Sequence, residues 1–145
     1  MSGRERGNSL VEFGVAMVVI FPLLAGTFHF GYSYFAYDNL ETSVRAAARY
    51  ASSRTYDSAD EKPSKEFASA VRNMAVYGNP AGGTRPVVPN LTTENVVVRV
   101  SFARGVPSEV SVQLSGYRIA GLFGSVPLSG KPRVAFPYIG RWAPI

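Results

Sequence analysis

The stretch that decides the fold is residues 13–37, FGVAMVVIFPLLAGTFHFGYSYFAY, which contain no Asp, Glu, Lys or Arg. About 25 residues of α-helix are roughly 37 Å long at 1.5 Å per residue, which exceeds a hydrocarbon core of about 30 Å. The stretch is longer than the apolar core of a cleaved secretory signal, about 7–15 residues. It is apolar on every side as far as Tyr32, whereas a core helix of a soluble protein keeps one polar face. We therefore expect a membrane-spanning helix.

The residues that follow continue the same helix. Residues 39–51, NLETSVRAAARYA, contain no helix breaker and are rich in Ala and Arg, which favour helix. We predict one helix from about Ser9 to Ser53, whose second half leaves the membrane. Pro22 has no amide hydrogen and leaves the carbonyl of Val18 without its helical partner, which predicts a kink between these two residues.

A short charged leader precedes the apolar stretch and ends in Gly7. Glu12 stands five residues later and is followed by the aromatic Phe13. This arrangement resembles the processing site of type IV prepilins. The resemblance implies that a prepilin peptidase cuts between Gly7 and Asn8, and that Gly7, Asn8, Glu12 and Phe13 form the processing site.

The resemblance extends over residues 7–53, about a third of the chain. Its motifs are Val11-Glu12-Phe13, Pro22-Leu23-Leu24, Phe30-Gly31 and Ala47-Ala48-Arg49-Tyr50-Ala51. Together they resemble the TadE-type pseudopilins of tight-adherence (Tad/Flp, type IVc) pilus systems. Relatives often carry a glutamate before the aromatic-Gly pair, where this chain has His29. A proton relay needs a second titrating group in reach, and the span offers none, so we expect His29 to be hydrogen-bonded or interfacial.

Glu12 is costly in a membrane helix, because a charge costs about 2.5–3.5 kcal/mol at the bilayer centre and less near the ends. Cleavage after Gly7 would create an α-ammonium about four residues, or roughly 6 Å, away along the helix axis. Our hypothesis is that Glu12 pairs with this amine on a staggered neighbouring subunit and so sets the register of assembly. The alternative is that Glu12 lies at the membrane interface and pairs with nothing.

The apolar helix also carries small residues, which let neighbouring helices approach closely and are the usual basis of helix association in lipid. These residues are Gly14, Ala16, Ala25, Gly26, Gly31 and Ala36. We predict that Glu12, Gly14, Pro22 and Gly31 take part in packing against other pilins or pseudopilins.

The remainder of the chain indicates a small domain that begins with a helix. Residues 53–66 are polar, contain Pro63 and predict a linker. Apolar residues then recur every three or four positions from about Ser64 to Tyr77, which predicts a second helix. Gly78, followed by Pro80, ends it.

Strands follow the second helix. Alternation with period two predicts strands over residues 96–103 and 110–115, joined as a hairpin by a longer loop from Arg104 to Ser108. A third strand is expected near residues 133–139, at an edge of the sheet because it contains Pro137. One helix packed on three or four antiparallel strands gives the α+β class.

We divide the chain into a prepilin-type leader over residues 1–7, a transmembrane and extended helix over residues 8–53, and an extracytoplasmic α+β domain over residues 54–145. Arg residues flank both ends of the span and do not choose a side, so the orientation rests on the leader. The resemblance implies a single pass through the inner (cytoplasmic) membrane, with the N-terminus in the cytoplasm, and incorporation into a surface pilus.

Composition argues against other classes of function. The net charge is +5, but Lys and Arg are scattered and form no basic stripe with aromatic side chains, so we expect no nucleic-acid partner. The chain has no cysteine, its only histidine lies in the span, and its carboxylates show no metal-ligand spacing. No Gly-x-Ser-x-Gly motif occurs. We therefore expect no catalytic residue, no cofactor and no metal site, and the lipid membrane as a partner.

Three functions remain open. The resemblance favours a minor TadE-like pseudopilin that acts in the assembly of a pilus for surface adhesion. The same helix would suit the structural subunit of an abundant filament. A protein that keeps its leader would instead be a membrane-tethered binding module that is not polymerised.

Overall fold

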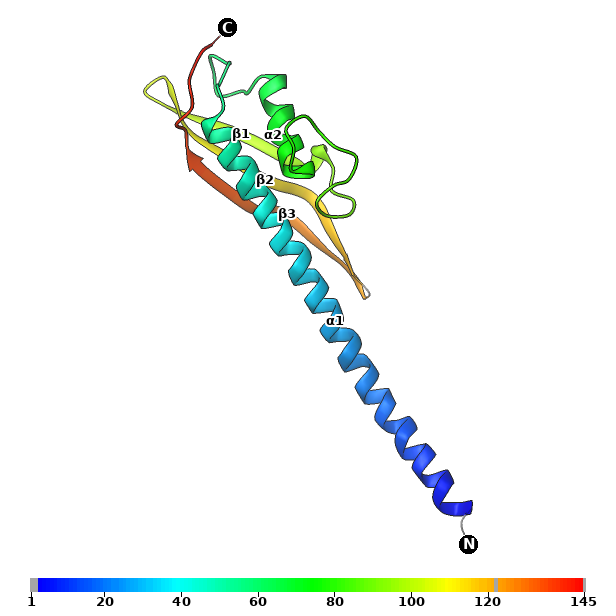
Figure 1. The fold of residues 1–145 in the computed structure, drawn as a ribbon. Coiled ribbons are helices and arrows are strands. Elements are labelled where there is room, and N and C mark those ends of the chain that lie inside the picture. The colour runs from blue at the N-terminus through cyan, green and yellow to red at the C-terminus, as the bar shows by residue number, and fades with distance from the viewer. Residues whose placement is uncertain (1–2, 122, 145) are drawn as a thin grey trace.

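The computed structural model describes residues 3–121 and 123–144, with side chains from Ser9 onward. It contains, in chain order, α1 (Gly3–Ser53), α2 (Lys65–Tyr77), the 3-10 helix η1 (Thr93–Asn95), β1 (Val96–Ala103), β2 (Val106–Gly121) and β3 (Gly124–Pro137). The three strands form one antiparallel sheet in the order β1-β2-β3. The α+β class predicted from the sequence is confirmed: a long apolar helix precedes one short helix and a small sheet (Figure 1).

α1 is a single helix of 51 residues that begins at Gly3, ahead of the predicted start near Ser9. It continues through Pro22 without ending. Its first half projects from the rest of the molecule, and its second half lies along the sheet (Figure 1). We call residues 9–35 the stalk and residues 36–53 the docked half.

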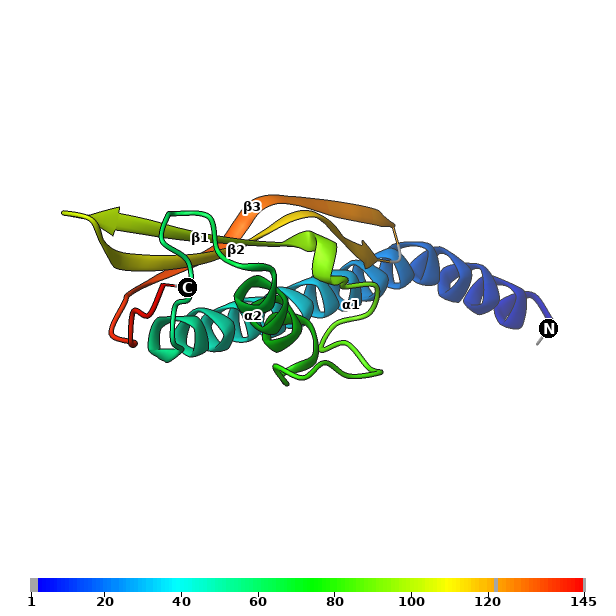
Figure 2. The same ribbon diagram turned by 90° about the horizontal axis from the view of Figure 1, so that it is seen from above.

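The docked half has an amphipathic pattern that the stalk lacks. Its buried apolar residues recur at spacings of mostly three and four, which places them on one face of the helix. They are Ala36, Leu40, Val44, Ala47, Ala48 and Ala51. Figure 2 shows α1 and α2 side by side on one face of the sheet, and the two helices contact each other.

The core lies between this pair of helices and the sheet. The largest fully buried side chains come from α1 and α2, the segment between them, and β1 and β2: Leu40, Val44, Tyr56, Phe67, Val71, Val76, Val96, Val110, Val112 and Leu114. The docked half of α1 therefore forms a wall of the core. The sequence had indicated only α2 as the helix packed on the sheet.

α2 has both of the ends that the sequence predicts. The Phe67 N–H donates to Ser64 Oγ at 3.0 Å, which caps the first turn. Gly78 takes a left-handed φ of 68°, and its N–H donates to the carbonyl oxygen of Met74 at 3.0 Å. A residue without Cβ adopts this conformation readily, so glycine is the usual residue at this position.

A tight turn joins β1 to β2, so the predicted longer loop from Arg104 to Ser108 is wrong. Ala103 pairs with Val106, and the turn residues Arg104 and Gly105 have positive φ angles of 54° and 80°. Two consecutive residues with positive φ form a turn whose twist matches that of a hairpin.

β2 and β3 form a second hairpin that is longer than predicted. β2 continues past residue 115 to Gly121, and β3 begins at Gly124 rather than near residue 133. Gly116 has a positive φ of 71° and lies where the register between the strands shifts. Such a bulge interrupts the period of two, which explains why the sequence pattern ended too early.

β3 lies at an edge of the sheet, as Pro137 predicts. It also contains Pro127 and Pro132. Proline cannot donate a hydrogen bond to a neighbouring strand and is tolerated where one side of the strand has no partner.

Candidate functional site

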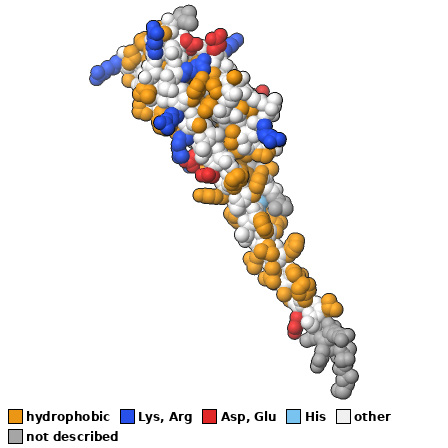
Figure 3. Space-filling model, in the orientation of Figure 1, with side chains coloured by type: hydrophobic (Ala, Val, Ile, Leu, Met, Phe, Trp, Pro, Cys, Tyr) orange, Lys and Arg blue, Asp and Glu red, His pale blue; other side chains and the backbone are white. Residues whose placement is uncertain are grey.

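The stalk is apolar and exposed over most of its surface. Leu10, Val18 and Phe30 are 72%, 73% and 77% exposed, and at 3.6 residues per turn they point in different directions. Hydrophobic side chains follow the stalk, whereas Lys and Arg gather over the sheet domain (Figure 3). Within the described part of the chain, α1 is the one helix long and apolar enough to cross a membrane. Soluble monomers rarely expose so large an apolar surface, so the stalk suits lipid or other helices.

The residues predicted for helix packing lie on this stalk. Glu12, Gly14, Pro22 and Gly31 are all exposed. A Cβ added at Gly14 or Gly31 would meet no atom within 4 Å, so both glycines leave open space at the helix surface. A neighbouring helix has room to approach there, and its packing stays a prediction.

The predicted processing site lies in the first turns of α1. Gly7 and Asn8 belong to the helix, although their side chains lie outside the described ones. Glu12 and Phe13 follow on the exposed stalk. The four residues therefore share one helical segment, and cleavage between Gly7 and Asn8 stays a prediction.

The tip of the β2–β3 hairpin touches the stalk at His29. A Cβ added at Gly121 would lie 2.2 Å from His29 Cε1, so the hairpin backbone meets the imidazole. Phe123 packs edge-on against the same ring, with centroids 5.7 Å apart. Nδ1 of His29 is buried and has no hydrogen-bond partner among the described residues, so the hydrogen bond expected for His29 is not found at this nitrogen. The imidazole acts as a packing group between stalk and hairpin.

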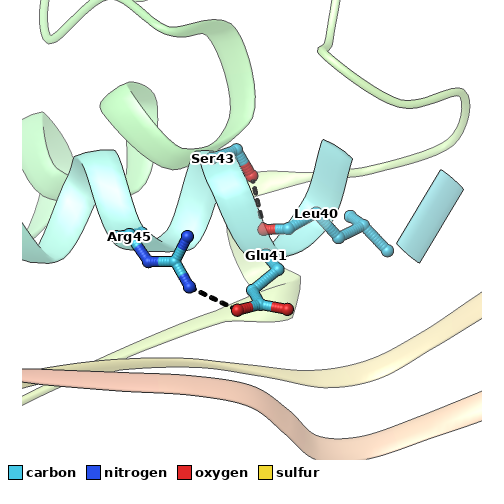
Figure 4. A network of polar contacts seen from close by, with 4 residues as sticks. All are labelled: Leu40, Glu41, Ser43 and Arg45. Carbon is cyan, nitrogen blue, oxygen red and sulfur yellow. Dashed lines mark hydrogen bonds and ion pairs between the residues drawn. The ribbon is translucent and has the colours of Figure 1, made fainter. Parts of the chain in front are cut away.

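Polar contacts appear where α1 becomes the docked half (Figure 4). On the exposed face, Arg45 Nη2 forms an ion pair with Glu41 Oε1, one turn earlier. On the buried face, Ser43 donates its hydroxyl to the carbonyl oxygen of Leu40 at 2.9 Å. The buried hydroxyl is thereby satisfied within the helix itself. The charged side chains of Glu41 and Arg45 thus face water, and the hydrogen-bonded hydroxyl of Ser43 faces the core.

The C-terminal segment closes over the end of α1. Tyr138 Oη accepts the N–H of Tyr56 at 2.9 Å and lies 2.8 Å from the carbonyl oxygen of Arg54 and 2.7 Å from that of Arg141. A Cβ added at Gly140 would lie 2.4 Å from the Arg54 oxygen, so a side chain has no room there. These contacts fix the chain where it leaves the docked half.

Trp142 completes this closure. The backbone of Trp142 forms a parallel β-bridge with that of Tyr56. The indole Nε1–H of Trp142 donates to the carbonyl oxygen of Ser58 at 3.0 Å. The sequence did not predict these contacts. The aromatic side chains at Tyr138 and Trp142, around Gly140, are the signal that could have indicated a packed C-terminal segment.

Burial changes the acid–base properties of two tyrosines in this region. Burial raises the pKa of Tyr56, and the carboxylates of Asp60 and Asp57 add to the increase. Burial also raises the pKa of Tyr138. Both side chains therefore stay neutral to a higher pH than an exposed tyrosine does.

The described residues offer packing surfaces rather than a reaction centre. Within residues 3–121 and 123–144, no group of three His, Asp or Glu side chains could hold a metal ion. The features that stand out are the exposed stalk, the hairpin tip that meets it and the closure around Tyr138.

Comparison with known proteins agrees with the motifs. Residues 7–49 match the family model described as TadE-like protein. The match begins at the predicted cleavage residue, covers the whole stalk and ends within the docked half, so the sheet lies outside it. No curated protein and no solved structure matches the chain. Residues 7–49 are therefore similar to the TadE-like proteins, a family of pilus components rather than of enzymes.

Proposed function

We propose that this chain is a minor pseudopilin that acts in the assembly of a Tad/Flp-type pilus for surface adhesion. The stalk anchors it by a single pass in the inner (cytoplasmic) membrane, with the N-terminus in the cytoplasm and the sheet domain outside. A prepilin peptidase cuts between Gly7 and Asn8, and the mature helix then packs against other pilins or pseudopilins. The TadE-like match over residues 7–49 supports the association with a pilus.

The observation that carries this proposal is the contrast within α1. One unbroken helix is apolar and exposed over most of residues 9–35, apart from the hairpin contact at His29, and is built into a folded domain over residues 36–53. A bare apolar helix needs lipid before assembly and other helices after it. A domain fixed to the end of that helix stays folded during the transfer, because its own core does not involve the stalk.

Processing would create a new cation near Glu12 in the assembled pilus. The new α-ammonium of Asn8 lies about four residues, or roughly 6 Å, from Glu12 along the axis. Because the two charges lie at different depths on one helix, a neighbouring subunit shifted along the axis brings its amine level with Glu12. An ion pair in surroundings of low dielectric constant is stronger than one in water, so it favours this one shift over others.

Mass spectrometry of the native N-terminus tests the proposal. We expect the protein purified from its own membrane to begin at Asn8. Gly7→Val should block cleavage, whereas Gly3→Val provides a matched control because it changes the other glycine of the leader and leaves the predicted site intact. A native chain that begins at Met1 would overturn the proposal and leave a membrane-tethered binding module.

The amount of protein in sheared surface fibres separates a minor pseudopilin from the structural filament subunit. A minor component is expected at a small fraction of the major pilin, by quantitative mass spectrometry of the fibres. A chain that makes up most of the fibre would be the structural subunit, and only the word minor would then be wrong.

A further inference from the structure

The β2–β3 hairpin extends beyond the rest of the sheet domain, towards the stalk. β2 and β3 stay paired as far as Gly121 and Gly124. The hairpin tip lies well away from the opposite end of the sheet and nearer to the N-terminal half of α1 (Figure 1). Its contacts with His29 show how far it reaches, because His29 belongs to the apolar stalk and lies before the docked half.

The depth of His29 follows from the geometry of the helix. A helix crosses a hydrocarbon core of about 30 Å with about 20 residues. If the apolar segment enters the core between Leu10 and Phe13, it leaves the core between about residues 29 and 32. His29 then lies at the outer boundary of the hydrocarbon region. The hairpin tip that touches His29 lies at the same level.

The chemistry of the tip suits that level. Residues 119–129, IAGLFGSVPLS, contain no charged side chain. Phe123 is 67% exposed although one edge of its ring meets His29, and Val126 is 44% exposed. Cations flank this uncharged tip on both strands, at Arg118 and Lys131.

This order of side chains, apolar at the tip and cationic behind it, is that of an element lying in a membrane interface. Aromatic and aliphatic side chains enter the boundary between headgroups and acyl chains, while Lys and Arg remain among anionic headgroups. On the stalk at the same level, Phe28 and Phe30 are exposed as well. With the apolar segment entering the core between Leu10 and Phe13, the tip is continuous with a surface of the stalk that lipid reaches.

We propose that the β2–β3 tip is a second membrane contact, which inserts Phe123 and Val126 into the outer interface of an anionic bilayer beside the stalk. The domain is then held at two points, so its height and tilt over the membrane are fixed. This inference rests on the membrane anchoring in the proposed function and is independent of cleavage and of assembly.

The absence of cysteine from the chain permits a direct test with single labels. The full chain, with Phe123→Cys, Phe28→Cys or Val106→Cys, is labelled with a nitrobenzoxadiazole fluorophore and reconstituted at low protein density. The vesicles contain phosphatidylcholine and phosphatidylglycerol. Val106 is a matched control, because it is apolar, is 47% exposed and lies at the turn of the other hairpin. Quenching by lipids with brominated acyl chains reports contact with the bilayer, and quenching by iodide reports contact with water.

We expect the label at position 28 to be quenched by brominated lipid and the label at position 106 by iodide. The label at position 123 should be quenched by brominated lipid at least half as strongly as that at 28, and its iodide quenching should be several-fold weaker than that at 106. A label at 123 that behaves like the one at 106 overturns the inference. A label at 123 that neither quencher reaches is covered by protein, which also overturns it. A label at 28 that iodide reaches overturns the membrane anchoring itself.

A second variant tests whether the apolar side chain causes the contact. With the fluorophore at Val126→Cys, the added substitution Phe123→Asp should abolish most of the lipid quenching, because a carboxylate draws the tip towards water. Val106→Asp in the same background should leave that quenching unchanged. Circular dichroism spectra of both variants report whether the domain remains folded. Equal lipid quenching with Phe123 and with Asp at this position contradicts the inference.

Discussion

The two halves of α1 share one backbone conformation and differ in what their side chains meet. In the stalk, apolar residues point outward on every side, as Phe30 and Val18 do. In the docked half, apolar residues such as Leu40 and Val44 are completely buried, and Glu41 and Arg45 face water. No loop separates the halves. The boundary between anchor and domain is therefore set by the pattern of side chains and not by a change of secondary structure.

Aspartate placed in the stalk and in the docked half should give the largest difference between the two halves of α1. Val44→Asp puts an unpaired carboxylate into the core, so we expect the free energy of unfolding to fall by about 3–5 kcal/mol. Val18→Asp should leave unfolding of the domain unchanged and instead disfavour membrane insertion by about 2.5–3.5 kcal/mol. Thermal melts in detergent measure the first effect, and extraction from membranes at alkaline pH measures the second. Similar melting temperatures for the two variants would contradict the division of α1.

A Gly→Ala substitution in the C-terminal closure should lower the free energy of unfolding more than one in the stalk, although this difference is smaller than that for aspartate. Gly140→Ala brings a Cβ within 2.4 Å of the Arg54 carbonyl oxygen, so we expect the free energy of unfolding to fall by about 1–3 kcal/mol. Gly26→Ala is the control, because a Cβ there meets no atom within 4 Å. Denaturant titration in detergent measures both values. If Gly140→Ala is as stable as Gly26→Ala, the closure does not hold the docked half.

Removing one glutamate from each half separates assembly from stability. Glu12→Ala should lower the amount of processed or assembled protein about tenfold, which corresponds to about 1.4 kcal/mol. Glu41→Ala removes an exposed ion pair with Arg45 and should cost about 0.3–0.5 kcal/mol of domain stability without affecting assembly. Mass spectrometry of the N-terminus and immunoblots of sheared fibres give the readouts. Normal processing together with normal assembly of Glu12→Ala would refute our hypothesis for Glu12.

Alkaline pH should give the smallest effect, confined to the domain. An unfolded tyrosine has a pKa of about 10, and burial raises the pKa of Tyr56 and Tyr138 in the folded state. Above pH 10 the unfolded chain therefore binds fewer protons than the folded chain, so stability falls as the pH rises towards the raised pKa values. Below pH 10 these two groups contribute no slope.

To measure this effect, denaturant unfolding is compared at pH 8 and at pH 11 for the unsubstituted protein, Tyr56→Phe and Tyr34→Phe. Tyr56→Phe should reduce the loss of stability between the two pH values. Tyr34→Phe should not, because Tyr34 is an exposed residue of the stalk. An unchanged pH dependence in Tyr56→Phe would show that other groups cause it.

Local patterns predicted the helices well. The charge-free run over residues 13–37 and the spacing of apolar residues before Gly78 each report on contacts within a few turns of helix. The ends of α2 were predictable for the same reason, because Ser64 and Gly78 act on the backbone of the adjacent turn. The processing and packing roles of Gly7, Glu12 and Gly31 stay predictions.

Features that depend on distant partners were not predictable in this way. The alternation in β2 is interrupted at Gly116, and prolines interrupt β3, so the second hairpin looked shorter than it is. The bridge between Tyr56 and Trp142 joins residues far apart in the chain. The contact between His29 and Gly121 likewise requires the fold, because neither residue carries a local signal for the other.

The unbroken course of α1 has a mechanical consequence. Every glycine and the single proline of this helix precede residue 32, so its most compliant positions all lie in the stalk. From Tyr32 to Ser53 the helix is stiff, and over most of that length it is clamped to the sheet. Bending of α1 is therefore expected within the stalk. The docked half and the sheet should rotate together as one rigid body when a torque acts on the membrane end of the helix.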